Sequence, residues 1–471
     1  MLPRLDQAYC PSALQGDTMQ RQAARGADKE DKGGMERVTL RVKAGQHLID
    51  GKMMNAKFSV ALCLVFLIHI ATCTFSLYIV SKRYVIFDIN YDSNSRQSAI
   101  FGVVISALLI STLFARANFT FGYFAGLYLS TSILGFVWLS YFSEFPYDHK
   151  AARISAIASL ISFLIPALWS QPLLKWSSLP SRTFEWIPAL ILAVSAVVLA
   201  WALFYGVVFV SIDNASNMRH SLPALPMLLQ YAIGIVIGAL LPFAFACYFF
   251  RRKWVLAGGI FCLIVCFYPV TLSKIVLLAP FLMAFFCLLG RALEARLATI
   301  MSLAIPTLFG LVAFVIFDQI LPFGLINLRL NAVPASALDH YNDFFSSHDI
   351  TRFCQISFVK RIFGCIYTEQ LSVVMEKAYH LGNYNASLFS TEGLASSGLY
   401  FAPISTFFCG LVVAFGNLTS GKLPPTFILV SGAVLVITLL NVPLSTALLS
   451  NGGAFLFLLW YLTPAEYFSK L

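Results

Sequence analysis

Long apolar runs separated by short polar stretches follow one another along the chain from residue 58 onward. A helix that crosses the hydrocarbon core of a bilayer, about 30 Å thick, needs roughly 20 predominantly apolar residues. Runs close to this length recur as far as the C-terminus, and they predict about twelve membrane-spanning helices. The predicted helices cover approximately residues 58–80, 98–114, 121–142, 154–169, 186–212, 225–250, 255–268, 275–289, 300–321, 398–415, 426–440 and 447–462.

The apolar runs are continuous, which distinguishes them from the strands of a transmembrane barrel. Each barrel strand shows about 10 residues in which apolar and polar positions alternate. Only helices and closed barrels satisfy all of their backbone hydrogen bonds inside a bilayer. The pattern therefore predicts an all-α fold, a polytopic helical bundle in a membrane.

One long polar interruption breaks the apolar pattern between residues 321 and 402. After Pro334, apolar side chains recur at helical spacing, while Asp339 and Asp343 share another face one turn apart. A second amphipathic helix is predicted from about residue 368 to residue 381, and Gly382 is expected to end it. The interruption is therefore expected to be a partly helical, folded loop.

These features divide the chain into four parts. Residues 1–57 are rich in Arg, Lys, Gly and Gln and have almost no apolar periodicity, so they are expected to form a disordered basic tail. Residues 58–321 carry about nine of the predicted helices, residues 322–397 form the large loop, and residues 398–471 carry the C-terminal membrane helices.

Charge orients the bundle. Only 11% of the residues are charged, and the net charge of +10 is concentrated in alternate loops, which is the pattern of cytoplasmic loops and not of nucleic-acid binding. The orienting residues are Arg116, Lys175, Arg182, Arg251, Arg252, Lys253, Arg291, Arg296, Lys422 and Lys470. This pattern predicts that both termini are cytoplasmic and that the large loop faces outward. In a bacterium, the protein would lie in the inner membrane and the loop in the periplasm.

Three cationic residues lie next to predicted membrane boundaries on the outward side. Lys274 follows a helix-breaking Pro269, Arg329 lies one turn beyond the ninth predicted helix, and Arg219 precedes His220 in a polar loop. Cations in these positions suit an anionic group such as a diphosphate, for which the guanidinium fork is well matched. The alternative is that they snorkel to the interface or contact negative lipids.

The large loop also holds candidates for proton transfer. Asp339, His340, Asp343 and His348 lie within ten positions, and Asp343, His348 and His340 are the preferred candidates for a base that activates a hydroxyl. The alternative for each of them is a solvated helix face. The sequence contains no phosphate-binding lysine loop, no zinc-protease motif and no nucleophile elbow, so no cofactor or metal ion is implied.

Two further groups in the loop carry interpretable chemistry. Asn383, Asn385 and Glu392 lie in a small polar segment and are suited to hydrogen bonding with a sugar, although a capped turn would look the same. Cys354 and Cys365 could form one disulfide if the loop lies in an oxidising compartment, and their spacing alone leaves this open.

The arrangement resembles the bacterial O-antigen and capsular repeat-unit polymerases, together with the related O-antigen ligases. The resemblance lies in about a dozen spans, a single large late loop, Arg329 followed by the Asn342–Phe345 run Asn-Asp-Phe-Phe, and the Asn383–Gly393 segment before a membrane helix. It implies a metal-independent glycosyltransferase that moves a glycan from undecaprenyl diphosphate to a sugar hydroxyl of a second lipid-linked unit. Its partners would be this lipid-linked oligosaccharide, membrane lipids and a chain-length regulator protein, but no nucleic acid.

Under this resemblance Arg329, Lys274 and Arg219 would neutralise the diphosphate, and Asp343 or a nearby histidine would be the base. A ligase differs from a polymerase only in its acceptor. A flippase of lipid-linked oligosaccharide could use the same cations without a base, although no internal repeat of the kind found in many transporters is visible. A non-catalytic scaffold of envelope assembly is a third alternative.

Overall fold

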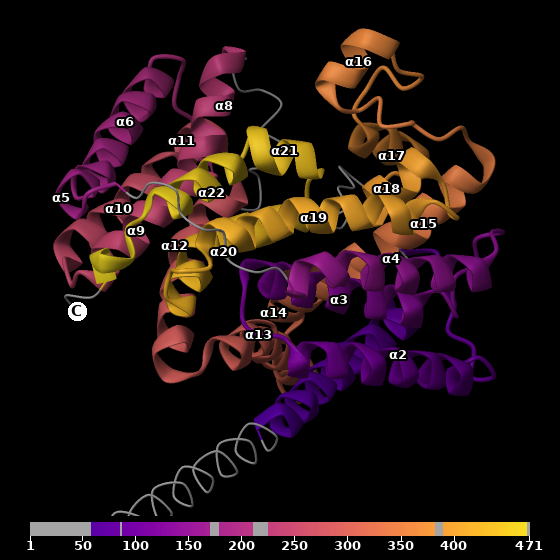
Figure 1. Ribbon diagram of the computed structural model, residues 1–471. Coiled ribbons are helices and arrows are strands. Elements are labelled where there is room, and N and C mark those ends of the chain that lie inside the picture. Colours follow the sequence, from indigo (N-terminus) through magenta and orange to yellow (C-terminus); the bar gives the residue numbers. More distant parts are fainter. Residues whose placement is uncertain (1–57, 85–86, 170–178, 211–224, 382–389, 469–471) are drawn as a thin grey trace, which may run out of the picture. The chain divides into compact units, whose positions relative to one another are not determined.

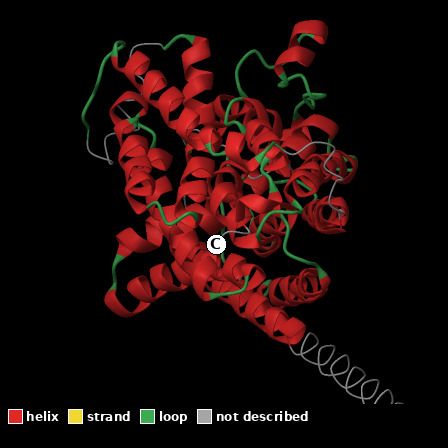
Figure 2. Ribbon diagram, turned by 60° about the vertical axis from the view of Figure 1, so that its left-hand side comes forward, coloured by secondary structure: helices red, strands yellow, loops and turns green. Residues whose placement is uncertain are grey.

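The computed structural model describes residues 58–84, 87–169, 179–210, 225–381 and 390–468. The chain divides into two compact units, Met1–Ala61 and Leu62–Leu471, and the predicted tail at residues 1–57 lies outside the described residues. Within the described residues the secondary structure is helical, apart from one isolated bridge between Ile89 and Ser143 (Figure 2). Ten helices are long and apolar enough to cross a membrane, so the chain is an all-α, multi-pass membrane protein.

These ten helices coincide with the first ten predicted spans (Figure 1). They are the first helix Phe58–Arg83, α2 (Arg96–Arg116), α3 (Phe121–Leu139), α4 (His149–Trp169), α5 and α6 together (Ser181–Leu203), α8 to α9 (Met227–Phe250), α10 to α11 (Trp254–Thr271), α12 (Lys274–Ala292), α13 (Ala295–Phe317) and α19 (Ala402–Ser420). Two shorter apolar helices, α20 (Pro425–Leu439) and α22 (Gly453–Leu462), occupy the last two predicted spans, and α21 (Leu444–Leu449) lies between them.

Helix α3 lies at the centre of unit Leu62–Leu471. All of its residues are buried, and it packs against α2, α4, α13, α19, α20 and the loop helix α15 (Val333–Ser347). Gly122 permits one of these contacts, since a Cβ at this position would lie 2.2 Å from the carbonyl oxygen of Ala167. Beyond the end of α3, the chain enters the region where the polar loops meet.

The large loop begins with a helix that packs into the bundle. Residues 320–347 are continuously helical, through α14 (Ile320–Phe323), a π-helical stretch η4 (Gly324–Ala332) and α15. In η4 the buried Asn327 amide donates to the Ser76 hydroxyl at 3.0 Å and to the Thr307 carbonyl at 2.9 Å. Residues assigned from the sequence to the start of the loop therefore contribute to the packing of the first helix and α13.

The rest of the loop folds around α15, as its amphipathic pattern predicts. The second predicted helix is α17 (Leu371–Tyr379), which ends at His380 in the left-handed conformation; Gly382, expected to end it, lies outside the described residues. Two further short helices are α16 (Ser357–Phe363) and α18 (Ser390–Ser397). Apolar side chains of α15, α17 and α18 form one small core, comprising Ala337, Tyr341, Phe344, Met375, Leu394 and Ala395.

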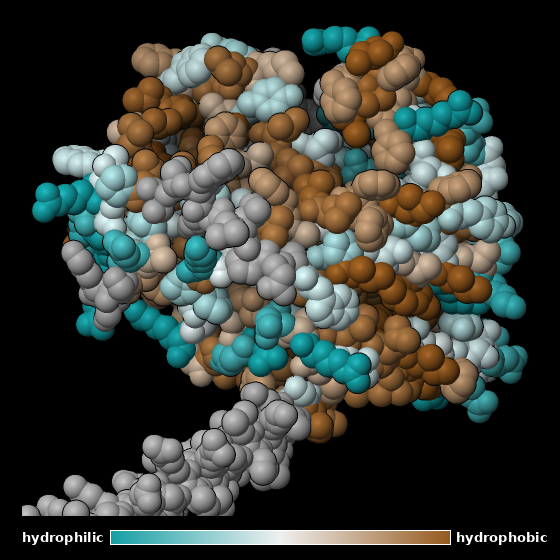
Figure 3. Space-filling view, viewed as in Figure 1, coloured by the Kyte–Doolittle hydropathy of each residue, from teal (hydrophilic) through white to brown (hydrophobic). Residues whose placement is uncertain are grey.

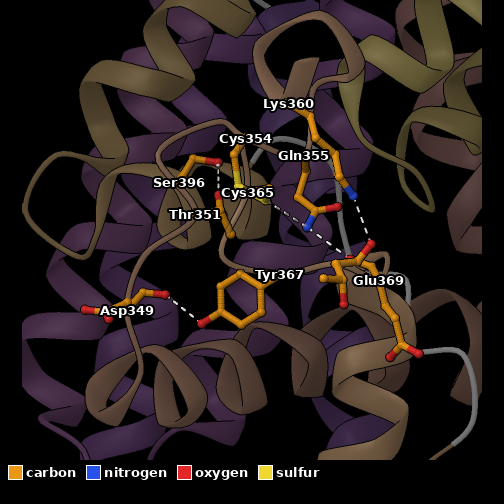
Figure 4. Close-up of a disulfide and its surroundings, with 10 residues drawn as sticks. Asp349, Thr351, Cys354, Gln355, Lys360, Cys365, Tyr367, Glu369 and Ser396 are labelled. Atoms are coloured by element: carbon orange, nitrogen blue, oxygen red, sulfur yellow. Dashed lines mark hydrogen bonds between the residues drawn. A yellow bond between two sulfur atoms is a disulfide. The ribbon is translucent and has the colours of Figure 1, made fainter. Parts of the chain in front are cut away.

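A disulfide joins Cys354 to Cys365 and closes the segment that carries α16 (Figure 4). Polar contacts hold this segment to its surroundings. The Tyr367 hydroxyl donates to the Asp349 carbonyl at 2.7 Å, and the hydroxyls of Thr351 and Ser396 lie 3.0 Å apart (Figure 4). The pairing that the sequence left open is therefore present in the structure.

Candidate functional site

Three loops that the charge pattern assigns to the same side of the membrane contact one another. The loop after the first helix meets the turn after α3, where the Asn90 amide donates to the Phe142 carbonyl at 2.8 Å and the Glu144 amide donates to the Asp88 carbonyl at 3.1 Å. The same turn reaches α15, because the Tyr147 hydroxyl donates to the carboxyl group of Asp339. Polar residues separated by up to about half of the chain thus form one cluster.

Asp339 is the most deeply buried acid of this cluster, with none of its side chain exposed. Its Oδ1 accepts the hydrogen bond from Tyr147, and its buried Oδ2 makes no hydrogen bond within the described residues. Burial raises the pKa of Asp339 to about 7, and the nearby negative charges of Asp343 and Asp88 act in the same direction, while the bond from Tyr147 opposes them. At neutral pH this carboxyl can both accept and release a proton.

His340 is also fully buried, and its ring orientation is fixed. Its Nδ1 donates to the Ser336 carbonyl at 2.7 Å, which leaves Nε2 directed toward the Asp88 carboxylate at 3.7 Å. The rings of Phe145 and Tyr379 contact the imidazole edge to face, at centroid distances of 4.9 and 4.8 Å. Burial lowers the pKa of His340, so the imidazole is neutral at pH 7 and Nε2 can accept a proton.

Asp343 lies one turn after Asp339 and is half-buried. Its Oδ2 accepts a 2.6 Å hydrogen bond from the Tyr379 hydroxyl, which also lies 3.2 Å from the His340 carbonyl. Burial, together with the adjacent Asp343 carboxylate, raises the pKa of Tyr379, so its hydroxyl stays protonated and remains a donor. Tyr379 therefore joins α17 to the cluster on α15.

The cluster reaches solvent at Asp88, whose side chain is 53% exposed. Behind Asp88, two proton acceptors, Asp339 and His340, lie on consecutive residues of one helix, and both are fully buried. This arrangement suits general base catalysis. A cation also lies near the cluster: Arg153 donates to the Ser140 carbonyl at 3.2 Å, and its positive charge acts on Tyr147.

The structure brings together only some of the predicted residues. His340 and Asp343 belong to the cluster, whereas His348 is exposed at the end of α15, where its ring stacks on Phe344 at 4.0 Å. Arg329 and Lys274 are exposed and make no polar contact with the cluster or with any other described residue. Arg219, Asn383 and Asn385 lie outside the described residues.

Glu392 lies apart from the cluster on Asp339. It is on α18, and its Oε2 accepts a 2.9 Å hydrogen bond from the Leu444 amide at the start of α21. Burial raises the pKa of Glu392. It also lines an apolar groove with Phe353, Phe408 and Ser405, so its predicted contact with a glycan stays a prediction.

Four members of the cluster are not predicted from the sequence. Asp88, Phe145, Tyr147 and Tyr379 come from three separate segments, and the only available signal was that these segments were assigned to the same side of the membrane. No group of three or more His, Cys, Asp and Glu side chains suited to a metal ion occurs in the described part of the chain.

Comparison of the chain with protein-family models, with curated proteins and with solved structures found no match. The argument for function therefore depends on the chemistry of the cluster and on its place in the bundle. The cluster contains a buried acid, a neutral histidine and two tyrosine donors, and it lies just beyond the end of the central helix of a membrane protein.

Proposed function

We propose that the chain is a glycosyltransferase of a bacterial inner membrane that polymerises oligosaccharide repeat units carried on undecaprenyl diphosphate, at the periplasmic face. The observation that carries the proposal is Asp339, a buried carboxyl whose pKa is raised to about 7 beside the neutral His340. A base of this kind is needed to activate a sugar hydroxyl, and a non-catalytic scaffold does not require one.

In the proposed reaction, a hydroxyl of the acceptor sugar forms a new bond to the anomeric carbon of the donor glycan. The bond from this carbon to the diphosphate breaks, and the diphosphate leaves with the electron pair. Asp339 takes the hydroxyl proton, and the adjacent His340, whose Nδ1 is held by the Ser336 carbonyl, is the alternative acceptor. Arg153 can stabilise the negative charge that develops on the leaving group, and Arg329 and Lys274 stay candidates for the same role.

The disulfide supports an outward orientation for this site. Cys354 and Cys365 lie in the loop that contains α15, and disulfides persist mainly in oxidising compartments such as the periplasm. The positive loops on the opposite side agree with cytoplasmic N- and C-termini.

The test is deletion of the gene in its native host, followed by complementation and separation of the surface polysaccharide on a gel. We expect the deletion to leave glycans of a single repeat unit. Asp339→Asn should not restore long chains, whereas Asp349→Asn, which changes an exposed acid nearby, should restore them. A second matched pair is His340→Gln and His348→Gln, of which only the first should reduce chain length.

Each variant must reach normal levels in the membrane for the comparison to hold. Full restoration by Asp339→Asn would contradict the proposed base. Accumulation of lipid-linked units on the cytoplasmic side, with no surface glycan, would identify a flippase instead, and long glycans that are not joined to their final acceptor would identify a ligase.

A further inference from the structure

An apolar groove opens beside α18, separate from the cluster on α15. Its cavity measures about 380 Å³, and its walls come from α18, α19, α21 and the disulfide-closed segment. Four lining residues belong to α19: Ser405, Phe408, Cys409 and Val412. They follow the i, i+3, i+4, i+7 spacing, so the groove runs along one face of this membrane helix for roughly 10 Å.

The opposite wall of the groove is α21, which contributes Leu444, Ser445 and Leu448. The end nearest the extramembrane loop is formed by Phe353, Ile356 and Phe358. The long axis of the groove therefore follows a membrane helix, with one end at the loop and the other inside the hydrocarbon region. A single extended hydrocarbon chain has this shape.

Helix α16 gives the loop end of the groove an unusual surface. Phe358, Ile362 and Phe363 are 67%, 69% and 81% exposed, although α16 belongs to the extramembrane loop. Lys360 and Arg361 lie between them on the same helix, and hydrophobic and hydrophilic side chains stand next to one another on α16 in Figure 3. Apolar side chains mixed with cations are typical of an element at the membrane interface.

Charge at the loop end of the groove favours an anion. Arg352 is exposed next to the lining residue Phe353, and Arg361 is exposed three positions after the lining residue Phe358. Lys360 donates to the Thr368 carbonyl at 2.9 Å. Three cations near one end of an apolar groove are complementary to a lipid that carries phosphate.

We infer that this groove holds the hydrocarbon chain of a polyprenyl phosphate carrier lipid, with its phosphate beside Arg352, Lys360 and Arg361. The inference rests on the proposed function, since this function supplies such a lipid. Helix α18 links the groove to the proposed catalytic cluster: Leu394 and Ala395 pack in the core with Tyr341 of α15, while Glu392 lines the groove. A carrier lipid held here lies one helix away from the proposed site of transfer.

The disulfide and Glu392 shape the groove. The bond between Cys354 and Cys365 fixes the segment from which Phe353, Ile356 and Phe358 line its end. The hydrogen bond from the Leu444 amide to Glu392 joins α18 to α21 across the groove. Glu392 therefore acts in the wall of a lipid site, which is a different role from the glycan contact expected from the sequence.

The test is photocrosslinking of the purified full-length protein in nanodiscs with a diazirine-labelled undecaprenyl phosphate, followed by mapping of the labelled peptides. Leu448→Trp fills the groove, and Leu449→Trp makes the same change at the adjacent, exposed position, which does not line it. We expect labelling on α19 and α21, and about tenfold weaker binding for Leu448→Trp but not for Leu449→Trp.

Arg361→Glu should weaken binding of the phosphate probe and leave binding of a labelled, uncharged polyprenol unchanged. Competition by dioleoyl phosphatidylglycerol as strong as that by unlabelled undecaprenyl phosphate would overturn the inference and identify a site for ordinary lipid. Unaltered binding by Leu448→Trp would also overturn it. Binding can be measured without turnover, so the two proposals fail separately. If the protein makes long glycan but its groove binds no carrier lipid, only the inference about the groove is wrong. If the groove binds the carrier lipid but the protein makes no polymer, only the proposed function is wrong.

Discussion

Asp339 and His340 show how one environment changes two side chains in opposite directions. Burial disfavours the charged form of each, so it raises the pKa of the carboxyl group and lowers the pKa of the imidazole. Asp339 consequently titrates near neutral pH, whereas His340 is held in its neutral form at pH 7. One turn further along α15, the half-buried Asp343 carboxylate accepts a hydrogen bond from the Tyr379 hydroxyl.

The raised pKa of Asp339 predicts two pH dependences. Glycan transfer should rise as the pH increases through about 7, because only the deprotonated carboxyl acts as a base. Stability should change in the opposite sense. Between the ordinary pKa of 3.8 and about 7, the folded protein keeps a proton on Asp339 that the unfolded chain releases. The contribution of Asp339 to stability is therefore present at low pH and is lost as the pH rises through about 7.

Both dependences can be measured on purified protein between pH 5 and pH 9. Transfer is measured in proteoliposomes, and thermal unfolding is measured in detergent. Asp339→Asn should lower transfer by about 100-fold or more and remove this part of the stability profile. Asp349→Asn serves as the control. An unchanged stability profile in Asp339→Asn would show that this carboxyl does not titrate near neutral pH.

At the scale of elements, the helix at residues 320–347 links the membrane bundle to the proposed site. Its η4 part is held among the first helix, α13 and α3, and its α15 part carries Asp339, His340 and Asp343. The close approach of α13 to η4 depends on Gly310, since a Cβ at this position would lie 2.0 Å from the Asn327 Oδ1. The position of α15 therefore depends on packing well inside the bundle.

Gly310→Ala is expected to displace the Asn327 amide from the Ser76 hydroxyl and the Thr307 carbonyl. The loss of these buried hydrogen bonds should destabilise the protein by about 1–3 kcal/mol, measured as a lower thermal midpoint in detergent. Gly259→Ala is the matched control, because a Cβ at that position on α10 meets nothing within 4 Å. Equal midpoints for the two variants would contradict this account of η4.

The sequence predicts elements well and contacts between them poorly. Apolar runs of membrane length identify the spans, since the bilayer requires this length whatever the neighbouring helices are. In contrast, the sequence assigns position 327 to the large loop, and only the structure shows that Asn327 is buried against Thr307 and against Ser76, which is far away along the chain. Asp339 and Asp343 are visible as a pair on one helix, but Tyr147 and Tyr379, which hold them, are not.

For the whole molecule, the testable question is which face meets the oxidising compartment. If the α15 side is periplasmic, Cys354 and Cys365 should stay paired in intact cells and react with a membrane-impermeant maleimide only after reduction by an impermeant phosphine. Cys354→Ser frees Cys365 and should permit labelling without reduction. Labelling that requires membrane permeabilisation would reverse the proposed orientation.

The burial of α3 has a consequence for how the chain is made. This helix is the least hydrophobic of the ten spans, and all of it is covered by protein. Five of the helices that cover it, α4, α13, α15, α19 and α20, are synthesised after it. During translation, α3 is therefore complete before most of the helices that bury it have been made. The order of synthesis thus makes completion of the bundle, and with it the site above α3, one of the last events in biogenesis.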